Sequence, residues 1–282
     1  MTEKKYGFIS MVRYQCAVQI RRKETVIVFY VVSLFVFMNF VTNVFSFWGK
    51  DVMEMYHPMK LLLLGIDSGA AGFYFLQCYP ILASIPAGFS FWKDRMSGEV
   101  VLQVARANKR DYFWGKAAAV FLVSFCVFAL PLLTEIALNC LAFPLHATGD
   151  TVGESVYDPY YIETVKQYMF SRLYIWSPYA YAIAFVLLFG VISGVLGMLT
   201  MAVSTFPIRF RVILLMPVYL LLYGISNIGS LLHIPFSTEY FLYLGMYSGG
   251  RLSAAAMFGL LAVLLLCSVW VIHVRAKEDL LR

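Results

Sequence analysis

Charge is scarce in this chain of 282 residues. Asp, Glu, Lys and Arg together make up 13% of it, whereas hydrophobic residues make up 61%. Soluble domains carry about 25% charged residues, so the composition excludes an ordinary soluble protein and indicates one embedded in a membrane. The net charge of +6 reflects basic residues in the segments that connect the apolar runs, and we expect no nucleic-acid partner.

Sequence motifs that bind nucleotides or metals are also lacking. Neither Gly49-Lys50 nor Gly115-Lys116 has the earlier glycine of a GxxxxGK loop, so this chain is not expected to bind ATP phosphates. No HExxH helix exists, the five cysteines form no CxxC pair, and the four histidines are far apart in sequence. We therefore expect no cofactor, no metal site and no catalysis by this chain, and thiols that pack within helices.

Long apolar runs are what the sequence does have. A helix needs about 20 mostly apolar residues to cross a hydrocarbon core of about 30 Å. Six runs qualify, and the second is kept despite Pro80 and Pro86 because neighbouring helices can satisfy the carbonyls that a proline frees. The prediction is an all-α integral membrane protein in which residues 1–282 form one domain with six spans, at about 26–47, 71–91, 117–143, 177–204, 212–233 and 253–274.

The segments outside the spans indicate the orientation of the chain. Alternate segments, beginning with the N-terminal one, hold 17 of the 22 Lys and Arg residues. Because basic residues concentrate on the cytoplasmic side of membranes, both termini are predicted to be cytoplasmic. The N-terminal segment repeats Phe8, Val12, Cys16 and Ile20 at every fourth position. That pattern fits either an amphipathic helix in the inner interface or an ordinary basic flank of the first span.

A serine and a histidine in the spans offer an enzymatic alternative. Ser193 in the fourth predicted span and His273 in the sixth have the layout of rhomboid intramembrane proteases. The sequence around Ser193 is not GxSG, however, and His273 lies at the cytoplasmic end whereas Ser193 lies near mid-membrane. A nucleophile and its base must approach to about 3 Å. Gly190, Gly194 and Gly197 are better explained as small residues that let helices pack closely.

The stretch from Trp92 to Lys116 concentrates charge, with nine of the chain's 38 Asp, Glu, Lys and Arg residues. A helix from Gly98 to about Asn108 would have two different faces. The apolar face carries Val100, Val104 and Ala107, and the polar face carries Glu99, Gln103, Arg106 and Arg110. A helix this short must lean on something. It is either a short amphipathic helix on the cytoplasmic side, between the second and third predicted spans, or a solvated basic loop packed on the membrane surface.

This stretch resembles the permease subunits of type-2 ATP-binding-cassette exporters. Its motif is similar to the acidic-Gly … Arg … Gly-Lys pattern that leads into the third span in that family. The matching residues are Asp94-Arg95-x-Ser97-Gly98-Glu99, Ala105-Arg106, Lys109-Arg110 and Tyr112-Phe-x-Gly115-Lys116. The amphipathic N-terminal segment, the six spans and the small residues of the fourth span extend the resemblance over nearly the whole chain. In that family the charged element is a coupling helix, which docks in a groove of a separate cytoplasmic ATPase.

The resemblance implies a function and a set of partners. The chain would be the membrane-spanning subunit of an exporter in a bacterial cytoplasmic membrane, surrounded by lipid and paired with a second copy or a homologous permease. A separate ATPase would bind ATP and Mg²⁺ and drive the export of an amphipathic cargo, such as a peptide, a drug or a lipid-linked molecule. An ATP-independent sensor or immunity protein is the alternative outside enzymes.

The resemblance also implies two groups of functional residues. The coupling residues would be Asp94, Arg95, Ser97, Gly98, Glu99, Val100, Val104, Arg106, Lys109 and Arg110, with Arg209 and Arg211 in the short loop after the fourth span. In the family the cargo path runs along spans one, two and five. This makes path candidates of Asn39, Asn43, Tyr219, Tyr223 and Asn227. Hydrogen bonds between helices explain the same polar stripes equally well.

Glu135 is the one acidic residue inside a predicted span, and ionisable groups at such positions are often functional. It follows Ala117 by 18 residues, a rise of about 27 Å along a helix, so it lies near the outer edge of the hydrocarbon core. We therefore expect an interfacial Glu that reaches the headgroups or bonds to a partner.

The orientation can be tested with a membrane-impermeant maleimide applied to whole cells. In a variant without native cysteines, a thiol introduced by Glu154→Cys should be modified, because Glu154 lies on a predicted outer segment. A thiol introduced by Lys109→Cys should be spared until the cells are opened. The opposite labelling pattern would overturn the predicted orientation.

Overall fold

Helices account for the regular structure that can be described. The computed structural model describes residues 7–52, 55, 57–65, 69–106, 108–145, 169–208, 210–231 and 251–277, and these contain no strand. The helices in chain order are α1 Phe8–Ile20, α2 Lys23–Ser46, η2 Pro58–Lys60, α3 Gly69–Ser84, α4 Ser90–Met96, α5 Glu99–Arg106, α6 Lys109–Ala142, α8 Ser171–Trp176, α9 Pro178–Ser204, η3 Arg211–Leu214, α10 Met216–Leu231 and α12 Arg251–Lys277. The predicted all-α class is confirmed for this part of the chain.

Four of these helices are long and apolar enough to cross a membrane. They are α2, α6, α9 and the stretch Met257–Lys277 of α12, and they coincide with the first, third, fourth and sixth predicted spans. The second and fifth predicted spans fall on α3 and α10, which have 16 residues each. That length is about 24 Å, short of a full crossing. The chain is thus a membrane protein by its helices, and the count of six spans stays a prediction.

The second predicted span is not one continuous helix. The sequence predicted an unbroken run over 71–91, but α3 ends at Ser84 and α4 begins at Ser90. Pro86 explains the break, since proline lacks an N–H and disfavours helical backbone at the residue before it. The carbonyl of Pro86 accepts a hydrogen bond of 2.5 Å from the hydroxyl of Thr25 on α2. The bend therefore packs against α2 and turns α4 into a new direction.

Glycines set the contact between α6 and α9 at the centre of the bundle. A Cβ built on Gly194 would lie 2.6 Å from the Phe121 ring, and one on Gly197 would lie 2.6 Å from the hydroxyl of Ser124. Gly190 meets Phe125 in the same way, at 2.8 Å. The prediction that these glycines permit close packing is confirmed. The two helices approach because one surface has no side chains there.

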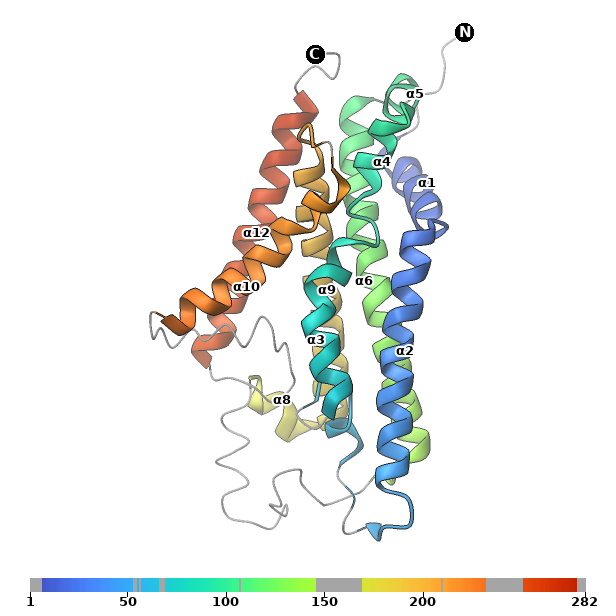
Figure 1. Cartoon of the computed structure of the whole chain (residues 1–282), viewed down its shortest axis with the longest axis vertical. Coiled ribbons are helices and arrows are strands. Elements are labelled where there is room, and N and C mark those ends of the chain that lie inside the picture. Colours follow the sequence, from blue (N-terminus) through green and yellow to red (C-terminus); the bar gives the residue numbers. More distant parts are fainter. Residues whose placement is uncertain are drawn as a thin grey trace.

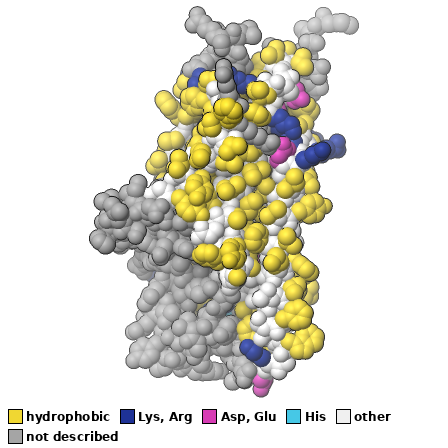
Figure 2. All heavy atoms as spheres, viewed as in Figure 1, with side chains coloured by type: hydrophobic (Ala, Val, Ile, Leu, Met, Phe, Trp, Pro, Cys, Tyr) yellow, Lys and Arg dark blue, Asp and Glu magenta, His cyan; other side chains and the backbone are white. Residues whose placement is uncertain are grey.

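The two described ends of the chain lie on the same side of the molecule. α1, α4, α5 and the Lys277 end of α12 all meet at one end of the bundle, which we call the terminal end (Figure 1). Figure 2 shows Lys and Arg side chains mostly toward this end, above a broad hydrophobic surface. The predicted topology requires both termini on one side of the membrane. The terminal end is its predicted cytoplasmic side.

The first helix packs on α6 with a face that the sequence did not single out. The expected helix is present, but Phe8 and Ile20 of its apolar row point outward. Its buried side chains are Met11, Gln15 and Gln19. Two of these are amides, which suit a surface where α6 presents a buried charge rather than an apolar face.

Substituting Gly194 tests the contact between α6 and α9. Gly194→Ala should lower the free energy of unfolding by about 1–3 kcal/mol, because a methyl group there overlaps the Phe121 ring. Gly259→Ala on α12 is the control, since no atom lies within 4 Å of the Cβ it would add. Thermal unfolding of the two variants in the same detergent makes the comparison. Equal unfolding midpoints would contradict the close approach.

Candidate functional site

A buried carboxylate joins three helices at the terminal end. Asp94 of α4 pairs with Arg22 at 2.5 Å and with the ammonium group of Lys116. Its carboxylate also accepts a hydrogen bond of 3.2 Å from the hydroxyl of Tyr112. Arg22 caps the start of α2, whereas Tyr112 and Lys116 lie one turn apart on α6. We call Arg22, Asp94, Tyr112 and Lys116 the Asp94 cluster. A carboxylate buried this far from water needs such partners to offset its desolvation.

Two glutamines extend the Asp94 cluster to α5. The side chain of Gln15 on α1 accepts a hydrogen bond of 3.4 Å from Lys116. Its amide nitrogen donates to the side-chain oxygen of Gln103 on α5, at 2.6 Å. Val100 of α5 is buried in the same core as α6. A continuous set of polar contacts therefore runs from α5 through α1 to α6, α4 and the start of α2.

The loop after α9 is attached to α4 as well. The indole nitrogen of Trp92 donates to the carbonyl of Ile208 at 3.0 Å, and the guanidinium of Arg95 donates to the carbonyl of Phe206 at 3.1 Å. From the other side, the guanidinium of Arg275 lies 4.4 Å from the centre of the Phe206 ring. The two predicted coupling elements are the charged segment at α4 and α5 and the loop after α9, about 100 residues apart in the sequence. They are neighbours in the structure because α4 donates hydrogen bonds to that loop.

The side chains of α5 divide into those that pack against the bundle and those that are exposed on its surface. Val100 is 5% exposed and Val104 packs against the core, so the apolar face expected to dock faces inward. The outward apolar side chains are Val101, 60% exposed, and Leu102, 64% exposed. The reason is that α5 leans on α1 and α6 and buries its own apolar stripe there.

The remaining coupling residues have simpler positions. Gly98 has a φ of 74°, a left-handed conformation that lets the chain turn from α4 into α5. Ser97 ends α4, with its hydroxyl donating to the carbonyl of Asp94 at 3.3 Å. Glu99 and Arg110 are exposed and Lys109 is half-buried. Arg209 and the side chains of Arg106 and Arg211 lie outside the described residues.

A second polar cluster holds the loop at the opposite end of the bundle. The amide of Asn39 donates to Glu135 and to the carbonyl of Leu61, both at 2.8 Å. Asn43 donates to the same carbonyl at 2.7 Å, and the backbone N–H of Leu63 donates to Glu135 at 2.7 Å. The expected partner of Glu135 is therefore the chain's own segment 57–65. For Asn39 and Asn43 these contacts favour helix packing over a cargo path.

The path candidates on α10 contact α3. The rings of Tyr219 and Tyr223 stack with their centres 4.3 Å apart. The hydroxyl of Tyr223 donates to the side-chain oxygen of Gln77 on α3, at 2.5 Å. The side chain of Asn227 lies outside the described residues. The structure thus brings the predicted second and fifth spans together through aromatic and amide groups.

The two groups considered for catalysis contact other residues. The hydroxyl of Ser193 is buried and donates to the carbonyl of Phe189 at 2.8 Å, with the hydroxyl of Tyr79 at 2.9 Å. His273 lies beside the Trp114 ring, with centres 6.4 Å apart. These contacts give a Ser193–His273 pair no support. Within the residues that the structure describes, no three His, Cys, Asp or Glu side chains are grouped so that they could hold a metal ion.

The sequence matches no protein-family model, and no curated protein or solved structure matches it significantly. The resemblance to exporter permeases therefore rests on the motif around α4 and α5 and on the helical architecture.

Sequence reasoning missed Gln15 and the contacts of Gln103 and Lys116 with it. A signal was present, since Gln15 and Gln19 lie four residues apart on a helix with an apolar row, and Lys116 directly precedes a long apolar run. Amides and a lysine at such positions indicate buried polar partners.

Substitutions in the Asp94 cluster test whether it holds the terminal end together. Asp94→Leu should lower the free energy of unfolding by about 3–5 kcal/mol, because it leaves the Lys116 ammonium buried without its carboxylate. Combining it with Lys116→Met should restore part of the loss, since the buried ammonium is removed while Arg22, 12% exposed, keeps the carbonyl of Ser90 as a partner. Detergent unfolding curves measure both effects.

The matched control is the neighbouring pair of Lys93 and Glu24, with 3.6 Å between nitrogen and oxygen and with Lys93 54% exposed. Lys93→Met should cost less than about 1 kcal/mol, as exposed pairs do. A double variant of Asp94 and Lys116 that is no more stable than Asp94→Leu alone would contradict the assignment.

Proposed function

We propose that this chain is the membrane-spanning subunit of an exporter that a separate cytoplasmic ATPase drives. The observation that carries the proposal is the position of α5, a short helix with outward apolar side chains at the terminal end. Gln103, Gln15 and the Asp94 cluster tie α5 to α1, to the start of α2 and to the first part of α6. This arrangement has the features of a coupling helix in a type-2 ATP-binding-cassette exporter.

The arrangement suits the transmission of movement. α6 is continuous from Lys109 to Ala142 and has 34 residues, a length of about 51 Å. A displacement of α5 by a partner therefore reaches a helix that passes through the whole membrane. The loop at Phe206 shares the contact through Arg95, so α9 would move with it. Buried ion pairs keep these elements in a single arrangement rather than letting them slide.

The docking surface consists of the groups that α5 presents to the outside. Leu102 and Val101 supply the apolar contact, and the exposed charges of Glu99 and Arg110 fix the register on a hydrophilic partner. Burying about 100 Å² of apolar area there contributes roughly 2.5 kcal/mol to binding. The partner binds ATP and Mg²⁺, and this chain does not.

The transport path is formed with a second permease copy or a homologous permease. Since Asn39 and Asn43 bind the segment 57–65, the path residues are Tyr219 and Tyr223 on α10 and their neighbours. Stacked tyrosines with hydroxyl groups offer both apolar and polar contacts. They suit an amphipathic cargo such as a peptide, a drug or a lipid-linked molecule, carried across the cytoplasmic membrane of a bacterium.

Purification from the native host in a mild detergent tests the proposal. The wild-type chain should bring down an ATPase in equal amount, and Leu102→Glu should remove most of it while expression stays unchanged. Glu99→Arg should lower the amount of ATPase recovered, because the two proteins associate more slowly. Val52→Glu, also on an exposed side chain but at the opposite end, should keep the complex intact. Purification of the wild-type chain without any ATPase would contradict the proposal and favour a sensor or immunity protein.

A further inference from the structure

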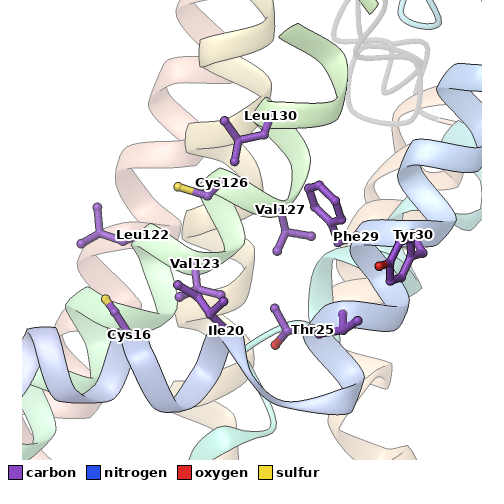
Figure 3. A pocket seen from close by; sticks show the side chains of 11 residues that line it. Cys16, Ile20, Thr25, Phe29, Tyr30, Leu122, Val123, Cys126, Val127 and Leu130 are labelled. Carbon is purple, nitrogen blue, oxygen red and sulfur yellow. The ribbon is translucent and has the colours of Figure 1, made fainter. Parts of the chain in front are cut away.

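A cavity of about 410 Å³ lies at the elbow between α1 and α2, against α6. Figure 3 shows its walls, which come from α1 through Cys16 and Ile20, from α2 through Phe29 and Tyr30, and from α6 through a row that ends at Leu130. Its volume falls within the range of about 300–1,000 Å³ that is usual for small-molecule sites. Its lining is almost wholly apolar, so its occupant must present a hydrocarbon surface.

The elbow between α1 and α2, two of the helices that line this cavity, is basic. Ile20 and Thr25 line it from either side of the elbow, and the three residues Arg21, Arg22 and Lys23 lie between them. Arg22 turns inward to Asp94. Arg21 and Lys23 are exposed.

The acidic side chain of the elbow does not cancel this charge. Glu24 forms its ion pair with Lys93, on the α4 side. An apolar slot beside a turn with exposed cations, at the start of a helix long enough to cross a membrane, matches the chemistry of one class of molecule. That class has a hydrocarbon chain joined to an anionic headgroup.

We infer that the cavity binds the acyl chain of an anionic phospholipid, whose headgroup phosphate contacts Arg21 and Lys23. The acyl chain lies between α1 and α6 and covers the thiols of Cys16 and Cys126. The site does not depend on the exporter proposal, since it uses a different surface from α5. It requires only that the apolar helices lie in a membrane.

Native mass spectrometry of the full-length protein measures lipid retention directly. The protein is released from micelles that contain equal amounts of phosphatidylglycerol and phosphatidylcholine with the same acyl chains. Wild type should retain one phosphatidylglycerol about tenfold in excess of phosphatidylcholine, because two cations near the membrane surface favour the anionic headgroup. The combined change Arg21→Gln and Lys23→Gln should abolish the preference and leave some binding of both lipids. Lys50→Gln, at the opposite end of α2, should leave it unchanged.

Filling the cavity separates its acyl-chain contact from the headgroup contact. Cys126→Phe should abolish retention of both lipids, because the ring occupies the slot. Cys267→Phe is the matched control, since Cys267 is another outward-facing thiol on an apolar helix but does not line the cavity. Equal retention by these two variants would overturn the site. So would equal retention of the two lipids by wild type.

A measurement on the unchanged protein keeps the inference testable if a variant fails to fold. A phosphatidylglycerol with a photoreactive diazirine in its acyl chain is added to wild-type protein in nanodiscs. After illumination, the crosslinked peptides should contain Cys16, Phe29 or Cys126. Crosslinks confined to α9 or α12, or insensitive to competing unlabelled phosphatidylglycerol, would overturn it. A second copy of this chain covering the cavity would appear as protein–protein crosslinks and would overturn it as well.

Discussion

The terminal end depends on a single carboxylate that is held away from water between two cations. Asp94 is the point where α4, the start of α2 and the beginning of α6 meet. A buried charge is stable only when its partners are well positioned, because short contacts with them must offset the cost of removing it from water. The elbow at Arg22 and the break that Pro86 makes before α4 place these two charged groups where they form an ion pair.

The same principle acts at the other end of α6. Glu135 holds the segment 57–65 through Asn39 and the backbone of Leu63, as Asp94 holds the elbow. Lys116 and Glu135 lie 19 residues apart on one helix, about 28 Å along its axis. Between them α6 packs on the glycines of α9. α6 is therefore the element against which both non-spanning ends of the bundle are fixed.

The sequence predicted what length and periodicity can determine. The apolar runs became α2, α6, α9 and α12, and the glycines at 190, 194 and 197 became a close helix contact. It failed where tertiary contacts decide. The run over 71–91 was predicted as one span, although the helix ends at Ser84 and a new one begins at Ser90. Val100 was expected to dock on a partner, although it is buried in the protein. Periodicity separates two faces of a helix, but it does not say which one meets the protein.

The elbow divides three adjacent cations between two environments. Arg22 is turned into the Asp94 cluster, whereas Arg21 and Lys23 face outward beside an apolar cavity. α1 and α6 thus form a wall of that cavity and also carry the contacts that reach α5. A bound ligand shifts a conformational equilibrium only when it binds one state more tightly. If α5 moves α1 relative to α6, the cavity changes shape, and a lipid bound there would act on the same equilibrium as a partner bound at α5.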